Sequence, residues 1–344
     1  MQKTRFTEKI QLALLDPADP RSILDEQASK DLSLRILLTS SLMKKWQLIT
    51  TRVRTASPQQ QTKSQLRELG LRQSVVDSQI FVGDQLCVML HEHVMLIGGE
   101  KLQQEDVLAK LSACMPLEDT RQLDEKTPLN FLGRSLEYSR AERSISLHLP
   151  SAFYLQLLRR YSLEDATSRD SPGDELEHEA PRWTNIILDA EKTKLYRQTV
   201  GDLQWSSLSR PDISFAVQQL SNSFMQPTES HEQQLVNVLR YLKGTQHYSI
   251  SLQPPRRWKK AKNLELLAFS SVSWSGACRS ISGLSLSFMG VPLATSTTRQ
   301  ATSTKAAELD SVRMACTQAI HTKSLLQDLQ LTQPFALRVL TGGP

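Results

Sequence analysis

The 344-residue sequence predicts an α+β protein with more than one domain. Three observations support this prediction. Short apolar runs separated by turn residues occupy residues 79–97. Apolar residues recur at helical spacing between residues 196 and 244, and residues 264–340 combine strand-like alternation with one long helical stretch. Hydrophobic residues make up 39% of the chain, which is enough for the cores of two modest domains.

The net charge and the spacing of the cysteines limit which binding partners and which cellular compartment we expect. A formal net charge of +5 permits nucleic-acid binding without establishing it. The four cysteines lie far apart without a C-x-x-C pair, which argues against a zinc site or a disulfide framework. The sequence has neither a signal-peptide core nor an apolar run of membrane-spanning length. We therefore expect an intracellular protein of the cytoplasm or nucleus without a membrane partner, and its oligomeric state is left open.

The first part of the chain predicts strands covered by helices. Residues 1–30 are polar and mixed, and we assign them nothing. Residues 34–46 have the pattern of a helix with one apolar face, and residues 47–53 follow as a strand. Gly83 and Asp84 are turn residues and predict a hairpin. The expected strands lie at residues 79–82, 85–90 and 94–97, and the expected helices at residues 65–71 and 102–115.

Further strands precede an acidic segment. Residues 130–137 are expected to pair with the alternating residues 144–149, and residues 152–161 should form a helix. Residues 164–182 then hold seven acids and almost no apolar residues. This composition is typical of a solvated, flexible linker, which we place at residues 164–185.

The clearest helical pattern lies between residues 196 and 252. Pro211 stands where a helix begins, and Asp212 meets the positive end of its dipole. A second helix opens near Thr228 and ends at Gly244. In the first helix, Phe215, Leu220 and Phe224 recur at roughly helical spacing. The buried face of the second helix consists of Leu235, Val236, Val238, Leu239 and Leu242. A half-buried strand follows, in which Tyr248, Ile250 and Leu252 alternate.

The last part opens with a basic loop around one tryptophan. Its candidate nucleic-acid-binding residues are Arg256, Arg257, Trp258, Lys259, Lys260 and Lys262. Such cations can engage phosphates while the indole ring stacks on a base, or the tryptophan can anchor a charged loop to its domain. Strands are expected at residues 264–270, 282–290, 291–295 and 335–340, with a helix at residues 304–329.

The sequence motifs of the central stretch resemble those of a known family. Its motifs are Tyr196-x3-Val200-Gly201-x-Leu203, Ser209-Arg210-Pro211-Asp212-Ile213-x-Phe215-Ala216-Val217 and Leu239-Arg240-Tyr241-Leu242-Lys243-Gly244-Thr245. In this order they resemble the connection segment of copia-type retrotransposon polyproteins, which joins reverse transcriptase to ribonuclease H. The C-terminal words Ala268-Phe269-Ser270-x3-Trp274, Ser282-Gly283 and Ala307-Glu308-Leu309 resemble the ribonuclease H domain of the same family.

This resemblance implies a division of the chain. A partial reverse-transcriptase palm and thumb would occupy residues 31–163, ahead of the acidic linker at residues 164–185. A helical connection would follow at residues 186–253, and an incomplete, truncated ribonuclease H-like α/β domain at residues 254–344.

The resemblance also implies where metal-binding carboxylates belong. Both activities of the family use carboxylates around two Mg²⁺ or Mn²⁺ ions. The polymerase aspartates correspond to Arg52, His93 and Val94, and a slip of one residue would use Glu92 and His93. The ribonuclease H acids correspond to Ser271, Glu308 and Gly342, with Ser273 at a further acid of the first motif. Glu308 is therefore the single matching carboxylate.

Three functions are compatible with this pattern. The first is a catalytically inactive remnant of the polyprotein, with no cofactor expected. The second is a non-catalytic module that binds RNA–DNA hybrid or another nucleic acid weakly and in a salt-sensitive manner through the basic loop. The third is a polymerase or nuclease with unusual metal ligands among His91, Glu92, His93 and Glu308. His91 and His93 could face the same way on a strand, but one pair without a third ligand does not make a metal site. We favour the first function, because the carboxylates are missing together with a palm segment between Ala56 and Gln65.

Overall fold

The computed structural model describes residues 3–4, 26–54, 58–173, 186–275, 278–299, 304–331 and 333–342. The chain forms two compact units. The first comprises residues 1–147, 251–295 and 301–344, and the second comprises residues 148–250 and 296–300. The predicted α+β class is confirmed, and the strands form three sheets.

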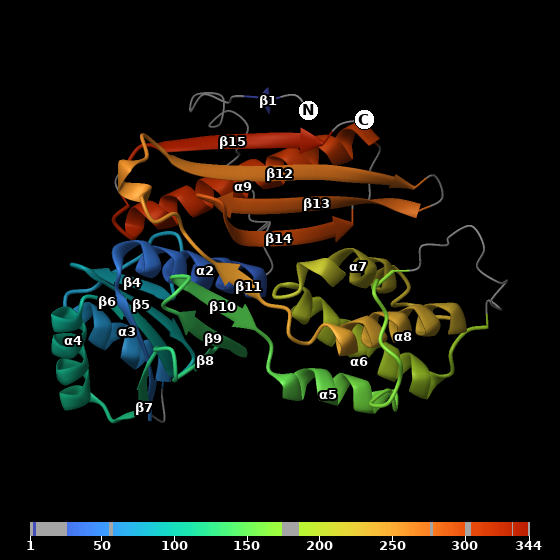
Figure 1. Ribbon diagram of the computed structural model, residues 1–344, viewed down its shortest axis with the longest axis horizontal. Helices are drawn as coiled ribbons and strands as arrows, with labels where there is room; N and C mark the ends of the chain where they lie inside the picture. The colour runs from blue at the N-terminus through green and yellow to red at the C-terminus, as the bar shows by residue number, and fades with distance from the viewer. Residues whose placement is uncertain are drawn as a thin grey trace. The chain divides into compact units, whose positions relative to one another are not determined.

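A six-stranded sheet in the order β3-β4-β5-β6-β2-β7 belongs to the first unit (Figure 1). Its strands are β2 (Gln47–Val53), β3 (Arg72–Gln73), β4 (Ile80–Gly83), β5 (Leu86–His91), β6 (Val94–Gly99) and β7 (Leu117–Gln122). The predicted hairpin is confirmed, since β4 and β5 pair antiparallel with Gly83 opposite Leu86. Gln85 in the turn adopts a φ of 51°. Strand β7 escapes sequence prediction because all but one of its side chains are exposed and it shows no alternation.

Three helices accompany this sheet. They are α2 (Glu26–Lys44), α3 (Pro58–Glu68) and α4 (Lys101–Cys114). Helix α4 is confirmed, and its residues Val107 and Leu111 are buried in a core cluster with Phe81 and Leu90 of the sheet. Helix α3 begins earlier than predicted, because its first turn is rich in glutamine and carries no apolar signal.

Helix α2 is buried on all sides, so the expectation of a single apolar face is wrong. Every residue from Asp31 to Ser41 is buried. The helix contacts β5 and β6 of the sheet and also helix α9 (Thr304–Asp328). Because these elements enclose it, its polar face is covered as well, and Asp31 pairs there with Arg35 at 2.7 Å and with Arg134 at 2.9 Å.

A four-stranded sheet in the order β11-β10-β9-β8 follows. Its strands are β8 (Leu129–Phe131), β9 (Arg134–Ser139), β10 (Ser144–His148) and β11 (Ile250–Leu252). The predicted pairing of β9 with β10 is confirmed, but residues 130–137 are two strands and not one. Leu132 and Gly133 adopt φ angles of 52° and 72° and reverse the chain, which the glycine permits at little cost.

A five-stranded sheet in the order β1-β15-β12-β13-β14 holds the C-terminal strands. The C-terminal strands are β12 (Leu264–Ser275), β13 (Cys278–Phe288), β14 (Val291–Arg299) and β15 (Phe335–Gly342), and β1 (Lys3–Thr4) pairs with β15. Strand β12 pairs antiparallel with β13 and parallel with β15, and α9 packs on one face of the sheet (Figure 1). The four predicted strands and the helix of this part are confirmed.

The end of α9 is bonded to the edge of the six-stranded sheet within the first unit. Asp328 accepts hydrogen bonds from Arg72 at 2.8 Å and from the Ser74 hydroxyl at 2.6 Å. The Lys44 ammonium donates to the Leu329 carbonyl at 2.8 Å. These contacts fix the helix beside α2.

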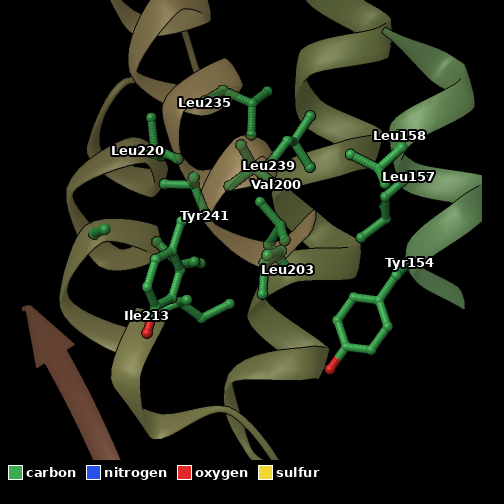
Figure 2. Packing of buried hydrophobic residues seen from close by; sticks show 14 of the residues in the cluster. Tyr154, Leu157, Leu158, Val200, Leu203, Ile213, Leu220, Leu235, Leu239 and Tyr241 are labelled. Atoms are coloured by element: carbon green, nitrogen blue, oxygen red, sulfur yellow. The ribbon is translucent and has the colours of Figure 1, made fainter. Parts of the chain in front are cut away.

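The second unit is a set of helices around one apolar core (Figure 2). They are α5 (Ser151–Arg160), α6 (Ala190–Ser207), the 3₁₀ turn η1 (Pro211–Ile213), α7 (Ser214–Asn222) and α8 (Glu229–Gly244). The predicted buried face of α8 is confirmed for Leu235, Val238, Leu239 and Leu242, whereas Val236 is half-buried. In α7, Leu220 is buried and Phe215 is 48% exposed. The 3₁₀ turn η1 occupies residues 211–213, so α7 begins at Ser214, three residues after Pro211.

The predicted linker has two parts. Residues 174–185 lie outside the described residues. Half of residues 164–173 are exposed and the rest are half-buried. Helix α8 holds this segment, because Lys243 donates to the Ala166 carbonyl at 2.7 Å and Arg240 donates to the Thr167 carbonyl at 2.7 Å. This described part is solvated but tied down.

Candidate active site and nucleic-acid interface

The positions of the expected polymerase aspartates converge in space. Arg52 of β2 pairs in register with Val94 of β6. His93 lies in the turn between β5 and β6, where its carbonyl accepts the Val53 amide at 2.7 Å. The sheet therefore brings together the three side chains that the resemblance assigns to metal-binding carboxylates. They are an arginine, a histidine and a valine.

The acids near these positions do not restore a metal site. Glu92 is exposed in the turn with a φ of 51°. Glu118 of β7 stands opposite Arg52, and its carboxylate pairs with Arg54 at 3.4 Å. Two metal ions need several carboxylates that face one space, whereas here a cation occupies the first position. Among the described residues no group of three histidine, cysteine or acidic side chains could hold a metal ion.

The two histidines are not arranged as expected. His91 ends β5 and His93 belongs to the turn, so they do not share one face of a strand. The positive φ of Glu92 between them reverses the chain and breaks the alternation that the expectation assumed.

The ribonuclease H positions also converge. Ser271 of β12 pairs with Gly342 of β15 on one side and with Gly283 of β13 on the other. Next to it, the Ser311 hydroxyl of α9 donates to the buried Ser270 hydroxyl at 2.9 Å. Glu308 lies three residues before Ser311, about one helical turn, and is exposed. The strands therefore bring together the positions at which the resemblance places a carboxylate cluster, but Glu308 is the single carboxylate among them. The side chain of Ser273 lies outside the described part of the chain.

The basic loop is anchored at its tryptophan. Trp258 begins the 3₁₀ turn η2 (Trp258–Lys260), and its indole N–H donates to the Met43 carbonyl of α2 at 2.9 Å. Lys259 stands 5.7 Å from the centre of the indole ring. Arg256 donates to the Ala141 carbonyl at 3.3 Å. The ring is thus engaged by the protein, while the five cations of the loop are exposed.

A hollow of about 850 Å³ lies beside this loop and was not foreseen from the sequence. Its walls come from the end of α2, the start of β2, residues 122–126 after β7, and the β9–β10 hairpin. The sequence signal is weak, because its cations Lys45, Lys126, Arg140 and Arg143 are scattered over three segments. The two arginines that flank the turn between β9 and β10 are the only local clue.

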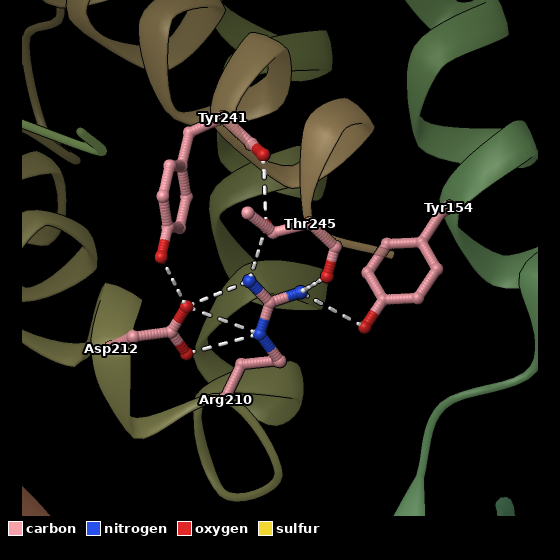
Figure 3. A network of polar contacts seen from close by, with 5 residues as sticks. All are labelled: Tyr154, Arg210, Asp212, Tyr241 and Thr245. Carbon is pink, nitrogen blue, oxygen red and sulfur yellow. Dashed lines mark hydrogen bonds and ion pairs between the residues drawn. The ribbon is translucent and has the colours of Figure 1, made fainter. Parts of the chain in front are cut away.

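The Ser-Arg-Pro-Asp motif of the second unit is structural (Figure 3). The Arg210 guanidinium is 2% exposed and binds both carboxylate oxygens of Asp212, at 2.7 to 3.2 Å. It also donates to the Tyr154 hydroxyl at 3.3 Å and to the Thr245 carbonyl at 2.9 Å, and the Tyr241 hydroxyl donates to Asp212 at 2.8 Å. The network joins α5, η1 and α8.

This network sets the protonation of its members. Burial alone would raise the pKa of Asp212, but the hydrogen bonds and charge of Arg210 hold that pKa below its usual value. Burial alone would lower the pKa of Arg210, but its bonds to Asp212 and Tyr154 raise it instead. The pair is therefore ionised at neutral pH and holds the helices together. Asp212 acts as the partner of this arginine more than as a helix-dipole residue.

Two predicted absences concern thiols and membranes. Cys87, Cys114 and Cys316 have free thiols, and burial raises the pKa of Cys87, which makes this thiol unreactive. In the described part of the chain, no helix has the length and apolar character needed to span a bilayer.

Comparisons with known proteins agree with the resemblance that the motifs indicate. No protein-family model matches the chain. The Pol polyprotein of transposon RE1 from Arabidopsis thaliana is 32% identical over 223 residues, which is 62% of this chain and 14% of the polyprotein. The RE2 polyprotein of the same plant is 31% identical over 225 residues, with the same coverage. The chain is homologous to copia-type retrotransposon Pol polyproteins.

Two further similarities are more limited. This Pol-related chain is 36% identical over 81 residues to an uncharacterized mitochondrial protein of Arabidopsis thaliana, which is 24% of the chain and 31% of that protein. A solved structure of a foamy viral protease-reverse transcriptase in complex with RNA/DNA hybrid aligns over 89% of this chain and 46% of the viral chain. The TM-score is 0.43 and the identity is 10%.

Proposed function

We propose that this chain is a non-catalytic derivative of the reverse transcriptase–ribonuclease H region of a copia-type Pol polyprotein. The observation that supports the proposal is the strand register. It juxtaposes Arg52 with Val94 and Ser271 with Gly342, where metal-binding acids would have to stand. Phosphoryl transfer with two metal ions requires carboxylates that neutralise charge on the attacking and leaving oxygens. Arg52 repels the ion that an aspartate would bind.

A single gel tests this proposal. The protein is incubated with an end-labelled RNA–DNA hybrid that carries a recessed primer, with nucleotides and Mg²⁺ or Mn²⁺. We expect neither primer extension nor RNA cleavage. Metal-dependent turnover that is lost in Glu308→Ala, or in His91→Ala combined with His93→Ala, would establish unusual ligands and overturn the proposal.

A gain-of-function variant tests the geometry independently of activity. Ser271→Asp combined with Gly342→Asp places two carboxylates on paired strands, with Glu308 on the adjacent helix. Mn²⁺ binding should appear in this variant by calorimetry and weaken when Glu308→Gln is added. If the double variant folds and binds no Mn²⁺, the assignment of these positions is wrong.

A second candidate function is binding of RNA–DNA hybrid through the basic loop. It is favoured by five exposed cations on a loop whose tryptophan fixes its position. Each phosphate contact contributes about 0.9 to the slope of log K against log salt. Arg257→Gln combined with Lys262→Gln should therefore weaken hybrid binding and reduce the slope by up to about 2.

Two exposed lysines of α4 supply the matched control. Lys101→Gln with Lys110→Gln removes the same charge from residues that pair with Glu105 and Asp106 on their own helix. This control should leave hybrid affinity unchanged. An equal loss in both variants would show that net charge alone is responsible, and salt-insensitive or absent binding by the wild type would reject this function.

A further inference from the structure

The hollow beside the basic loop is a separate concave surface of the first unit. Its volume is about 850 Å³. It reaches Gln47 and Leu48 at the start of β2, whereas Arg52 lies near the other end of that strand. Five residues of strand span about 16 Å. The hollow is therefore distinct from the positions of the expected polymerase acids.

The charges around the hollow favour an anionic occupant. Lys45, Lys126, Arg140 and Arg143 line it, and the guanidinium groups of the two arginines form no ion pair within the described part of the chain. Its two acids are already engaged by backbone amides. Asp124 accepts the amides of Lys126 and Thr127 at 2.7 and 2.8 Å, and Glu125 accepts the amide of Arg140 at 3.1 Å. The acids thus stabilise the walls, and Asp124 also interacts with the charge of Lys126. Four cations against two acids leave the lining with a net charge of +2.

One aromatic ring of the lining is available for stacking. Tyr138 of β9 is half-buried and borders the hollow. Trp46, the other aromatic residue of the lining, is 8% exposed, and the Lys44 ammonium lies 4.3 Å from its ring centre. A flat ring beside cations is the combination that binds an unpaired base with its phosphates.

The basic loop joins two walls of the hollow. At one end Trp258 is bonded to Met43 of α2, whose following residues line the hollow. At the other end Arg256 is bonded to the Ala141 carbonyl, and Gln253 donates to the Glu142 carbonyl at 2.9 Å. Both acceptors belong to the turn between Arg140 and Arg143. The cations of the loop and those of the hollow therefore lie close to the same turn of the chain.

We propose that the hollow binds an unpaired polynucleotide strand, with one base against Tyr138 and the flanking phosphates on Arg140 and Arg143. The proposal rests on the nucleic-acid binding described above and deepens it. A duplex keeps its bases stacked inside and its phosphates outside, so it cannot insert a base into a concave site without unpairing. The loop serves the backbone of either nucleic acid, while the hollow selects the single strand.

Fluorescence anisotropy of the full chain tests this selection. The probes are a labelled oligothymidylate and an RNA–DNA hybrid of equal length, at two salt concentrations. Stacking contributes about 1–3 kcal/mol per base, so Tyr138→Ala should weaken oligothymidylate binding by about 5- to 150-fold. Tyr138→Phe keeps the ring and should bind like the wild type. Hybrid affinity should be the same in all three proteins.

Charge variants supply the second measurement. Arg140→Gln with Arg143→Gln should weaken oligothymidylate binding and reduce its salt slope by about 1.4, at 0.7 per contact for a single strand. Lys101→Gln with Lys110→Gln is again the matched control. Circular dichroism melting shows whether each variant is folded, and Tyr138→Phe and the glutamine variants keep the shape of the site.

The outcomes separate this proposal from the function that it extends. If the wild type binds hybrid through the loop but does not bind oligothymidylate, the hollow is not a nucleic-acid site and the loop function stands. If Tyr138→Ala binds both probes like the wild type, or loses both equally, the stacking role is wrong. If the α4 control loses as much affinity as the arginine variant, the effect is net charge and the proposal fails.

Discussion

The strongest stability prediction concerns Arg210. Arg210→Ala removes a guanidinium that is 2% exposed and leaves the carboxylate of Asp212 without its partner. Breaking a buried ion pair by removal of one partner costs about 3–5 kcal/mol. The Asp212 side chain is 29% exposed and keeps the Tyr241 hydroxyl at 2.8 Å, so the lower end of that range applies. A loss of about 3 kcal/mol corresponds to a factor of roughly 100 in the opening equilibrium.

Hydrogen exchange of the full chain measures this loss where it occurs. Amides of α5 and α8 should exchange about 100-fold faster in Arg210→Ala, because the network joins these helices to η1, whereas amides of β5 and β6 should be unchanged. Asp212→Asn should cost less, since the amide still accepts from Tyr241. The double variant should cost less than the sum of the single ones, because the two residues share one interaction.

The stability that Asp212 contributes should also depend on pH, which provides a second test of its pairing with Arg210. The folded pKa of Asp212 is below its unfolded value of about 3.9. Its contribution is therefore fully present above that unfolded pKa and is lost as pH falls through the lower folded pKa. Arg210→Ala should remove this acid-dependent part. Exchange in α5 and α8 that equals the wild type in Arg210→Ala, or an acid dependence that survives, would refute the reasoning.

Three further predictions concern a cap, a close contact and metal ions. His231 accepts the Thr228 amide at 3.1 Å, and burial lowers its pKa. Its contribution to α8 is thus complete above the unfolded pKa of about 6.5 and declines as pH falls through the lower folded pKa, whereas melting of His231→Gln should be flat over this range. Gly98→Ala would place a Cβ 2.6 Å from the Ser41 hydroxyl and should cost about 1–3 kcal/mol by urea unfolding. Adding Ser41→Ala should recover most of that loss, and no recovery would disprove the contact as the cause. Millimolar Mg²⁺ should leave the melting temperature unchanged, since an ion bound only by the folded state would raise it.

Elements with a strong local signal could be predicted from the sequence. The β4–β5 hairpin follows from its turn residues, and α8 follows from its apolar spacing between Thr228 and Gly244. Elements without such a signal could not. Strand β7 is mostly exposed, and the reversal at Leu132 and Gly133 interrupts a stretch whose composition is that of one strand. The burial of α2 on all sides depends on α9, which is remote in sequence.

The candidate sites show the same contrast. The motif resemblance identified Arg52 and Val94, or Ser271 and Gly342, as related positions, and the strand register brings each pair together. A motif match assigns positions one by one along the chain, so it needs no knowledge of the distances between them in the fold. The hollow has no such motif. Tyr138 and the four cations lie on three segments that are separate in the sequence, and only the fold brings these segments together.

The enclosure of α2 has a consequence for biosynthesis. Helix α2 leaves the ribosome well before α9, which packs against it and begins 260 residues after Lys44, at Thr304. Contacts between such distant segments close late and slowly. A nascent chain that has formed the six-stranded sheet still exposes one side of α2, and exposed surface of this kind invites aggregation. Completion of the first unit therefore waits until α9 has been made.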